Sequence, residues 1–144
     1  MTIRPASDRS LLVSFGERIS AGTRDQVARL TRCLEGAQPI LNLHPAYVSV
    51  LVDFDPSLYD SHEIETLIRL RWAEAQGAGD AAAPTRTVEI PVVYGGEFGP
   101  DLDAVARHTG LTPERVIELH ASAEYAVYFL GFSPGFPYLG GLPQ

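Results

Sequence analysis

Three groups of residues in the second half of this chain have the types and spacing that site chemistry requires. Tyr94-Gly95-Gly96-Glu97 places two glycines side by side, and consecutive backbone amides in such a turn can bind an anion without a lysine. His120 is the one of the four histidines that lies near the third group, just upstream of it in the sequence. The third group is the run YFLGFSPGFPYLGGLP at residues 128–143. The groups define a candidate anion site, one weak catalytic candidate and a candidate binding loop.

The run at 128–143 is the most specific of the three. Glycine allows backbone conformations that other residues avoid, and proline fixes the backbone and removes an amide, so the run predicts a rigid loop. Long, stiff, apolar loops in compact domains are usually functional. We predict that it contacts substrate or a partner through Gly131, Phe132, Pro134, Gly135, Phe136, Pro137, Tyr138, Gly140 and Gly141. A buried connection between barrel strands is the alternative explanation.

Other reactive side chains lack the surroundings that catalysis needs. Ser133 lies between Phe132 and Pro134 rather than in a Gly-x-Ser-x-Gly elbow, so we expect a loop hydroxyl. The four histidines show no ligand spacing and the single Cys33 cannot build a metal site alone, so no metal is predicted. The catalytic residues are therefore unassigned, with His120 as a weak candidate.

Composition argues against several functions. The net charge is −7 and the chain has no lysine, which excludes a P-loop and argues against a nucleic-acid partner. Two short helices around Gly110 have helix-turn-helix spacing, but Glu114 and Glu118 in the second helix favour a plain helical pair. No apolar stretch suits a membrane span, and the first residues do not resemble a signal peptide. We expect a cytoplasmic protein.

Residues 1–76 predict an N-terminal α/β domain. Strands are expected at 10–15, 39–43 and 47–54 from their apolar alternation. One helix is expected to begin near Thr23, with Thr23 and Gln26 as its capping box, and another at Ser61. The resulting order β-α-β-β-α is most of a ferredoxin-like unit.

Residues 77–144 predict a linker and a second domain. The small-residue segment 77–85 is typical of a linker. Residues 86–144 contain an expected strand at 86–93, a helix capped by Asp101, a helix capped by Thr112 and a strand at 124–130. The whole chain is therefore predicted to be of the α+β class.

Four segments resemble a bacterial protein family. They are residues 8–16, His44-Pro45-Ala46-Tyr47, YGGEFGPDL at 94–102 and GFSPGFPYLGGLP at 131–143, of which the last two are the most specific. The family, with the carboxyltransferase domain, subdomains C and D, has three names: Kip inhibitor of a sporulation histidine kinase, allophanate hydrolase subunit 1, and the B subunit of 5-oxoprolinase. The resemblance implies a ferredoxin-like domain followed by the start of a cyclophilin-like β-barrel. The barrel would be incomplete, so the chain is expected to be truncated.

The resemblance also implies a function. As the B subunit of an ATP-dependent 5-oxoprolinase, the chain would act with a related C subunit to activate 5-oxoproline by phosphorylation with ATP and Mg. A separate A subunit would complete hydrolysis to glutamate. The alternative is a Kip-type inhibitor that docks on a sensor histidine kinase. Allophanate hydrolase subunit 1 is a lesser alternative, because Ser-Ser-Lys amidase chemistry needs a lysine. An incomplete barrel would expose strand edges, so self-association is expected.

Overall fold

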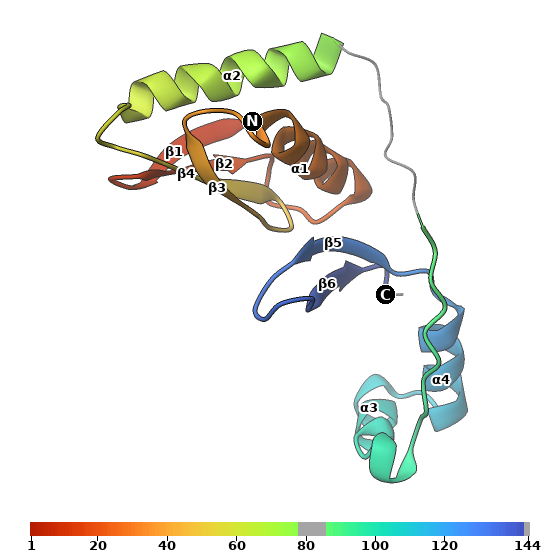
Figure 1. The fold of residues 1–144 in the computed structure, drawn as a ribbon. Coiled ribbons are helices and arrows are strands. Elements are labelled where there is room, and N and C mark those ends of the chain that lie inside the picture. The colour runs from red at the N-terminus through yellow and green to blue at the C-terminus, as the bar shows by residue number, and fades with distance from the viewer. Residues whose placement is uncertain (78–85, 143–144) are drawn as a thin grey trace. The chain divides into compact units, whose positions relative to one another are not determined.

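A computed structural model of the chain describes residues 1–77 and 86–142 and shows an α+β fold with antiparallel sheets (Figure 1). The described residues form two compact units. One contains residues 1–77 together with Tyr128–Tyr138, and the other contains residues 86–127 together with 139–142. The predicted linker 77–85 lies outside the described residues except for Gly77, which is the last residue of a helix.

The first unit contains a four-stranded sheet and two helices. The strands are β1 (Thr2–Ser7), β2 (Ser10–Ser14), β3 (Ile40–Pro45) and β4 (Ser49–Phe54), in the order β1-β2-β4-β3 with every neighbouring pair antiparallel. The helices are α1 (Ala21–Leu34) and α2 (Ser61–Gly77). The predicted order β-α-β-β-α is confirmed from β2 onward. The sequence analysis missed β1, because its exposed residues and Pro5 give no apolar alternation; proline is tolerated there on an edge strand.

Both helices cover the same face of this sheet. Alternate residues of β2 and β4 and residues three or four apart on the helices form one buried cluster, as the two periodicities require. The ring of Phe15 lies 5.0 Å from that of Trp72 at the edge of this cluster. The core residues are Leu11, Val13, Val27, Leu30, Leu34, Val50, Val52, Phe54, Ile64, Ile68 and Trp72.

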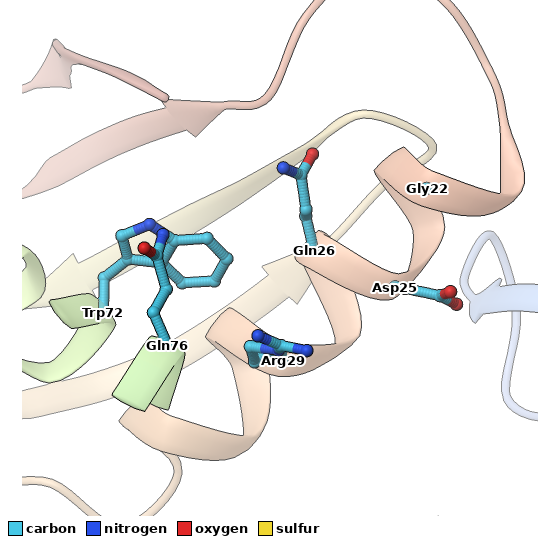
Figure 2. Close-up of a pocket in the computed structure, with 6 residues that line it drawn as sticks. All are labelled: Gly22, Asp25, Gln26, Arg29, Trp72 and Gln76. Carbon is cyan, nitrogen blue, oxygen red and sulfur yellow. The ribbon is translucent and has the colours of Figure 1, made fainter. Parts of the chain in front are cut away.

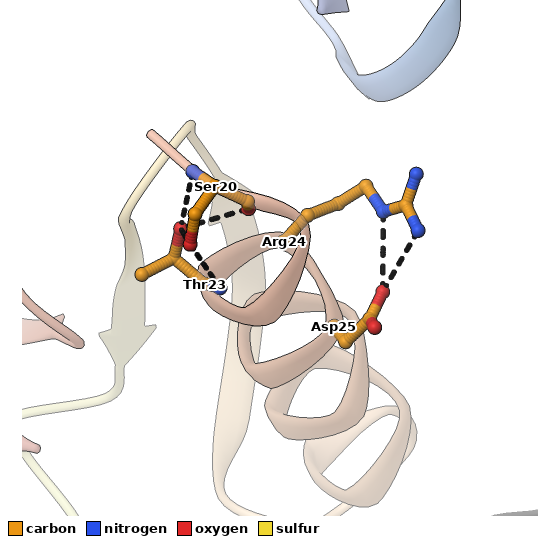
Figure 3. A network of polar contacts seen from close by, with 4 residues as sticks. All are labelled: Ser20, Thr23, Arg24 and Asp25. Carbon is orange, nitrogen blue, oxygen red and sulfur yellow. Dashed lines mark hydrogen bonds and ion pairs between the residues drawn. The ribbon is translucent and has the colours of Figure 1, made fainter. Parts of the chain in front are cut away.

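In both helices of the first unit, the residue that caps the N-terminus differs from the predicted one. Ser20, not Thr23, caps α1: its hydroxyl accepts from the Thr23 amide at 3.1 Å, and the Thr23 hydroxyl accepts from the Ser20 amide at 2.9 Å (Figure 3). Asp60 replaces Ser61 as the cap of α2, since its carboxylate accepts from the Glu63 amide at 2.9 Å. In both cases the residue that caps the helix lies upstream of the predicted one, by three positions for α1 and by one for α2.

The second unit begins with a segment that has no regular secondary structure. The strand predicted at 86–93 is absent from the described residues, and Ile90 is 76% exposed. Apolar alternation alone does not make a strand, because a strand also needs a partner for its backbone hydrogen bonds. The short 3-10 turn η1 (Gly96–Phe98) follows.

Two helices and a hairpin complete the described chain. They are α3 (Leu102–Thr109), α4 (Pro113–Ser122), β5 (Ala126–Leu130) and β6 (Pro137–Gly140), and the two strands form a separate sheet. Thr112 caps α4 as predicted, whereas the Asp101 side chain makes no cap hydrogen bond to α3. β6 was predicted as loop; Pro137 is its first residue, a position where a missing amide is tolerated.

A polar network ties together strands β2, β3 and β4 and reaches Ser7 of β1. The Ser10 hydroxyl donates to one oxygen of Asp53 at 2.8 Å, and His44 Nε2 lies 2.9 Å from the other. Ser7 donates to Ser10 at 3.0 Å. Burial alone raises the pKa of Asp53, but the hydrogen bonds from His44 and Ser10 outweigh it, so the pKa is lowered overall.

This network predicts an acid-dependent loss of stability. Because the pKa of Asp53 is lower in the folded chain, its contribution is complete above the ordinary carboxyl pKa of about 3.9 and is lost as pH falls through the folded value. We expect Asp53→Asn to lower the free energy of unfolding at pH 7 by about 1.5 kcal/mol and to flatten its decline in acid. Urea unfolding at several pH values measures both. Asp25→Asn is the control, since that carboxylate is 65% exposed; equal acid slopes for wild type and Asp53→Asn would contradict the prediction.

Candidate functional site

Two consecutive turns shape the tip of the β5–β6 hairpin. The Phe136 amide donates to the Ser133 carbonyl at 3.0 Å, with Pro134 and Gly135 between them. Gly135 has φ of +82°, so proline and glycine occupy the positions that a type II turn favours. The Gly131 amide donates to the Phe136 carbonyl at 3.1 Å and closes the tip. These bonds explain in physical terms why the glycine- and proline-rich run forms one fixed shape.

Ring stacking fixes the stem of the hairpin. The rings of Phe129 and Tyr138 lie 4.3 Å apart and 12° from parallel. A Cβ atom on Gly131 would lie 3.2 Å from the Tyr138 ring, so a side chain there would press on the stack. A Cβ on Gly141, where φ is +120°, would lie 2.5 Å from the Glu124 carbonyl oxygen. Gly141 is therefore required by close approach to a backbone carbonyl, whereas a side chain at Gly131 would have to displace the Tyr138 ring slightly; sequence alone reveals neither contact.

The predicted loop residues divide into an exposed tip and a half-buried stem. Phe132 is 90% exposed and Phe136 is 46% exposed, and their rings are 5.6 Å apart. Pro134 and Gly135 lie beside them at the exposed tip. Tyr138 is half-buried, and Pro137 and Gly140 begin and end β6.

Tyr47 is a neighbour of the stem that the sequence analysis did not place in the site. Within the first unit its ring lies 5.3 Å from Tyr128, 5.1 Å from Phe129 and 6.1 Å from Tyr138. The Arg24 guanidinium lies 5.8 Å from the Tyr128 ring centroid. The only sequence signal was an aromatic residue in the segment His44–Tyr47 that resembles the family.

The structure brings the candidate anion site and His120 together. The Tyr94 hydroxyl and His120 Nδ1 are 2.6 Å apart, and the two rings meet edge to face at 5.7 Å. Tyr125 lies on the other side: its ring is 5.4 Å from the imidazole, and its hydroxyl donates to the His120 carbonyl at 3.0 Å. His120 is thus held by two tyrosines while its side chain stays exposed.

The Gly-Gly turn after Tyr94 has a backbone suited to a small anion. Gly95 and Gly96, the first residue of η1, have φ of +74° and +57°, whereas Glu97 is not among the residues with positive φ, so the sign of φ changes as it does in anion-binding nests. A Cβ on Gly99 would lie 2.5 Å from the Gly95 nitrogen, which explains the third glycine. The Glu97 carboxylate is exposed beside this turn and opposes a bare anion.

The remaining reactive groups of residues 1–77 and 86–142 form no second reactive centre. Burial raises the pKa of the Cys33 thiol, whose sulfur donates to the Leu30 carbonyl at 3.2 Å, so a reactive thiolate is disfavoured. In the same ranges, no three His, Cys, Asp or Glu side chains are placed to hold a metal ion. None of the described helices has the length and hydropathy of a membrane span.

A polar cleft lies between α1 and α2. Its volume is about 370 Å³, and Trp72, one of its lining residues, is only 9% exposed. Figure 2 shows Asp25 pointing away from the indole. The cleft is lined by Gly22, Asp25, Gln26, Arg29, Trp72 and Gln76. No predicted site residue lies there.

Comparison with known proteins decides the family. The sequence model of the carboxyltransferase domain, subdomain C and D, matches residues 1–144. The chain belongs to this family. The carboxyltransferase-domain chain is 37% identical to the B subunit of 5-oxoprolinase from Bacillus subtilis (strain 168) over 99% of its own length and 63% of that protein. It is 54% identical to the protein of that name from Escherichia coli O157:H7 over 59% of its length and 38% of that protein.

A solved structure supports the fold of this carboxyltransferase-domain chain. A crystal structure of TTHA0988 superposes with a TM-score of 0.74 at 32% sequence identity, over 95% of this chain and 26% of that one. The chain thus spans less than two thirds of the two curated relatives and about a quarter of TTHA0988.

The glycines of the hairpin give a ranked prediction. Gly135→Ala meets no atom within 4 Å and should cost only the backbone penalty of positive φ, about 1 kcal/mol. Gly141→Ala adds a clash with a backbone carbonyl and should cost more than about 2 kcal/mol. Hydrogen exchange of the Gly131 and Phe136 amides measures the local stability. Gly22→Ala is the control and should be neutral or stabilising, because Gly22 lies in a helix and a Cβ there would make an ordinary contact with the Ser20 hydroxyl oxygen at 3.8 Å. A larger cost at Gly135 than at Gly141 would refute the ranking.

The Tyr94–His120 contact predicts a single imidazole tautomer. With the Tyr94 hydroxyl donating to Nδ1, the neutral ring carries its proton on Nε2. We expect nitrogen NMR shifts to show this tautomer in the wild type and a mixture of both tautomers in Tyr94→Phe. Tyr125→Phe, which loses only the bond to the His120 carbonyl, should keep the wild-type tautomer. A proton on Nδ1 in the wild type would reverse the assigned direction of the hydrogen bond.

Proposed function

We propose that the chain is part of the B subunit of an ATP-dependent 5-oxoprolinase. The observation that carries the proposal is the 37% identity to the Bacillus subtilis protein of that name over 99% of this chain. The proposed substrate is 5-oxoproline, and the proposed products are glutamate, ADP and phosphate. The C subunit would share the activation step, and the A subunit would complete the hydrolysis.

A finer description of the fold belongs to this proposal. In residues 1–76, β2, α1, β3, β4 and α2 follow the order of a ferredoxin-like domain, and β1 occupies the edge position beside β2. We assign residues 86–144 to the start of a cyclophilin-like barrel and residues 78–85 to the linker between them, since Gly77 belongs to α2. The hairpin β5–β6 and the apolar side chains of Val88, Ile90 and Val92 are the features that support this assignment.

The proposed chemistry explains why the chain needs no nucleophilic triad. A lactam amide is unreactive until its carbonyl oxygen is phosphorylated, which turns that oxygen into a good leaving group. Phosphoryl transfer depends on positioned donors and cations rather than on a protein nucleophile. Bound ATP with Mg would supply the phosphoryl group, and the protein would orient the substrate and exclude water.

The described residues fit one phosphate group better than a whole nucleotide. The backbone amides at Gly95, Gly96 and Glu97 are the proposed contacts, and His120, held by Tyr94, is the proposed side-chain donor next to them. The Glu97 carboxylate requires a cation to accompany any phosphate there. We assign substrate or partner contact to the loop Gly131–Gly141, through its exposed tip.

The exposed tip also suits the rival function. A Kip-type inhibitor acts by docking on a histidine kinase, and exposed aromatic rings are common anchors of protein interfaces. We also propose that the chain self-associates through residues 86–93. The apolar side chains of Val88, Ile90 and Val92 are exposed there and could pack against a second copy.

A chimera tests the proposal. The segment of the Bacillus subtilis protein that matches this chain is replaced by residues 1–144, and the product is combined with the A and C subunits. We expect ADP release that requires 5-oxoproline, at a rate within roughly tenfold of the natural enzyme. The 144-residue chain alone should release no ADP above background, because its described residues form no self-sufficient catalytic set.

Two controls make this test decisive. Allophanate replaces 5-oxoproline in a parallel reaction that is followed by ammonia release, because amidase chemistry forms no ADP, and circular dichroism checks that the chimera is folded. A folded chimera that releases ammonia from allophanate but no ADP with 5-oxoproline, or that acts on neither substrate, would exclude the 5-oxoprolinase function. Steady turnover by the isolated chain would show that the catalytic set is self-sufficient after all.

A further inference from the structure

Two tyrosines that lie far apart in the sequence contact the same imidazole in the second unit. Tyr94 immediately precedes the Gly-Gly turn, and its hydroxyl lies 2.6 Å from Nδ1 of His120. The Tyr125 ring lies 5.4 Å from the imidazole, and the two ring planes are 43° apart. The His120 side chain is therefore restrained by one hydrogen bond and by ring contacts with both tyrosines.

The place of the Tyr125 ring is set by its own hydroxyl. Helix α4 ends at Ser122, so the His120 carbonyl is one of the last four that lack a partner within the helix. The Tyr125 hydroxyl donates to this carbonyl at 3.0 Å. Ala123, at the C-cap, has an extended backbone rather than the left-handed conformation that closes many helices. One hydrogen bond thus satisfies the helix end and holds the Tyr125 ring against the imidazole of the same residue.

Gly141, just after β6, lies directly against the backbone that carries Tyr125. A Cβ atom on Gly141 would lie 2.5 Å from the Glu124 carbonyl oxygen and 3.4 Å from the Tyr125 Cα. Both are backbone atoms, so a change of rotamer makes no room and the backbone itself must shift. The φ of +120° at Gly141 adds strain for any residue with a side chain. A side chain at Gly141 therefore displaces Tyr125 and the ring contact with His120.

The contacts act on different properties of the imidazole. With the Tyr94 hydroxyl donating to Nδ1, the neutral ring carries its proton on Nε2. That single bond still allows the ring to rotate about the line from the Tyr94 oxygen to Nδ1, and the Tyr125 ring restricts the rotation. Tyr94 thus selects the nitrogen that bears the proton, and Tyr125 fixes the direction in which the proton points.

We propose that Tyr125 is a positioning residue for His120, and that Gly141 keeps Tyr125 in its place. Through these contacts the chain after β6 holds the Nε2 proton in one direction, as the donor to the phosphate group assigned above to Gly95 and Gly96. The role of that proton in turnover rests on the proposed function, whereas the orientation of the ring does not.

A purely structural role for Tyr125, as the cap of α4, is the alternative. Capping requires the hydroxyl, whereas positioning requires the ring. Tyr125→Phe removes the hydroxyl and keeps the ring, and Tyr125→Leu removes both while leaving an apolar side chain. The difference between the two variants therefore isolates the contribution of the ring.

Nitrogen NMR of the 144-residue chain measures the imidazole directly, with His120→Gln identifying its signals. We expect Tyr125→Leu and Gly141→Ala to lower the ratio of the Nε2-protonated tautomer to the other at least about threefold, the size of one aromatic ring contact. Tyr125→Phe should keep the wild-type ratio. Gly110→Ala is the matched control: Gly110 belongs to the same unit, has φ of +71° and has open space around it. It should lower the melting temperature without changing the ratio.

ADP release by the chimera with the A and C subunits tests the consequence for turnover. We expect Tyr125→Leu to lower kcat at least about tenfold, because displacing a positioned group slows catalysis steeply. In the His120→Gln background the same change should cause no further loss, since a positioning residue acts only through the residue that it holds. Gly110→Ala should turn over like the unmodified chimera.

The contrary outcomes are separate from one another. If Tyr125→Leu is folded by circular dichroism and keeps the wild-type tautomer ratio, the positioning role is wrong whatever the chimera does. Equal losses of ADP release in the presence and absence of His120 would make Tyr125 a structural residue only. If the ratio changes as expected but the unmodified chimera releases no ADP with 5-oxoproline, the proposed function fails and the orientation of the ring by Tyr125 stands.

Discussion

The stacking of Phe129 on Tyr138 is the contact on which the candidate binding loop depends. It joins the two strands of the hairpin where the loop leaves them, and it makes the space for a side chain at Gly131 tight. With the ends of the loop fixed at this point, the hydrogen bonds across Phe132 and across Pro134-Gly135 determine a single path for the backbone. The exposed rings at the tip therefore derive their direction from a half-buried pair in the stem.

The two halves of the chain obtain their order in different ways. In residues 1–77 an apolar cluster from two strands and two helices excludes water, and the polar network around Asp53 is an addition to it. In residues 86–142 the described burial is slight, with Ala106 as a buried apolar residue. Order there comes from turns, caps and pairwise ring contacts such as Tyr94 with His120. Local geometry thus replaces a core around the candidate site.

Elements that depend on local rules could be predicted from the sequence, whereas elements that depend on a distant partner could not. The apolar alternation of β4 and the proline after Thr112 indicated the right elements, because these signals act within a few residues. The segment 86–93 has the same alternation but lacks a strand, since pairing is not encoded in one segment. The loop was found from Pro134 and Gly135, whereas Tyr47 and the tyrosines that hold His120 depend on contacts that spacing does not reveal.

The hydrogen bonds that shape the tip all lie within residues 131–136. The central sheet is different, because β2 must find β4 across a long stretch of chain, pairing Ser10 with Asp53. Local contacts close quickly during folding and distant ones slowly, so the tip can take its shape without waiting for the sheet. The same locality has an evolutionary consequence: side chains at the tip can be exchanged, and a new partner acquired, while the register of the sheet is left untouched.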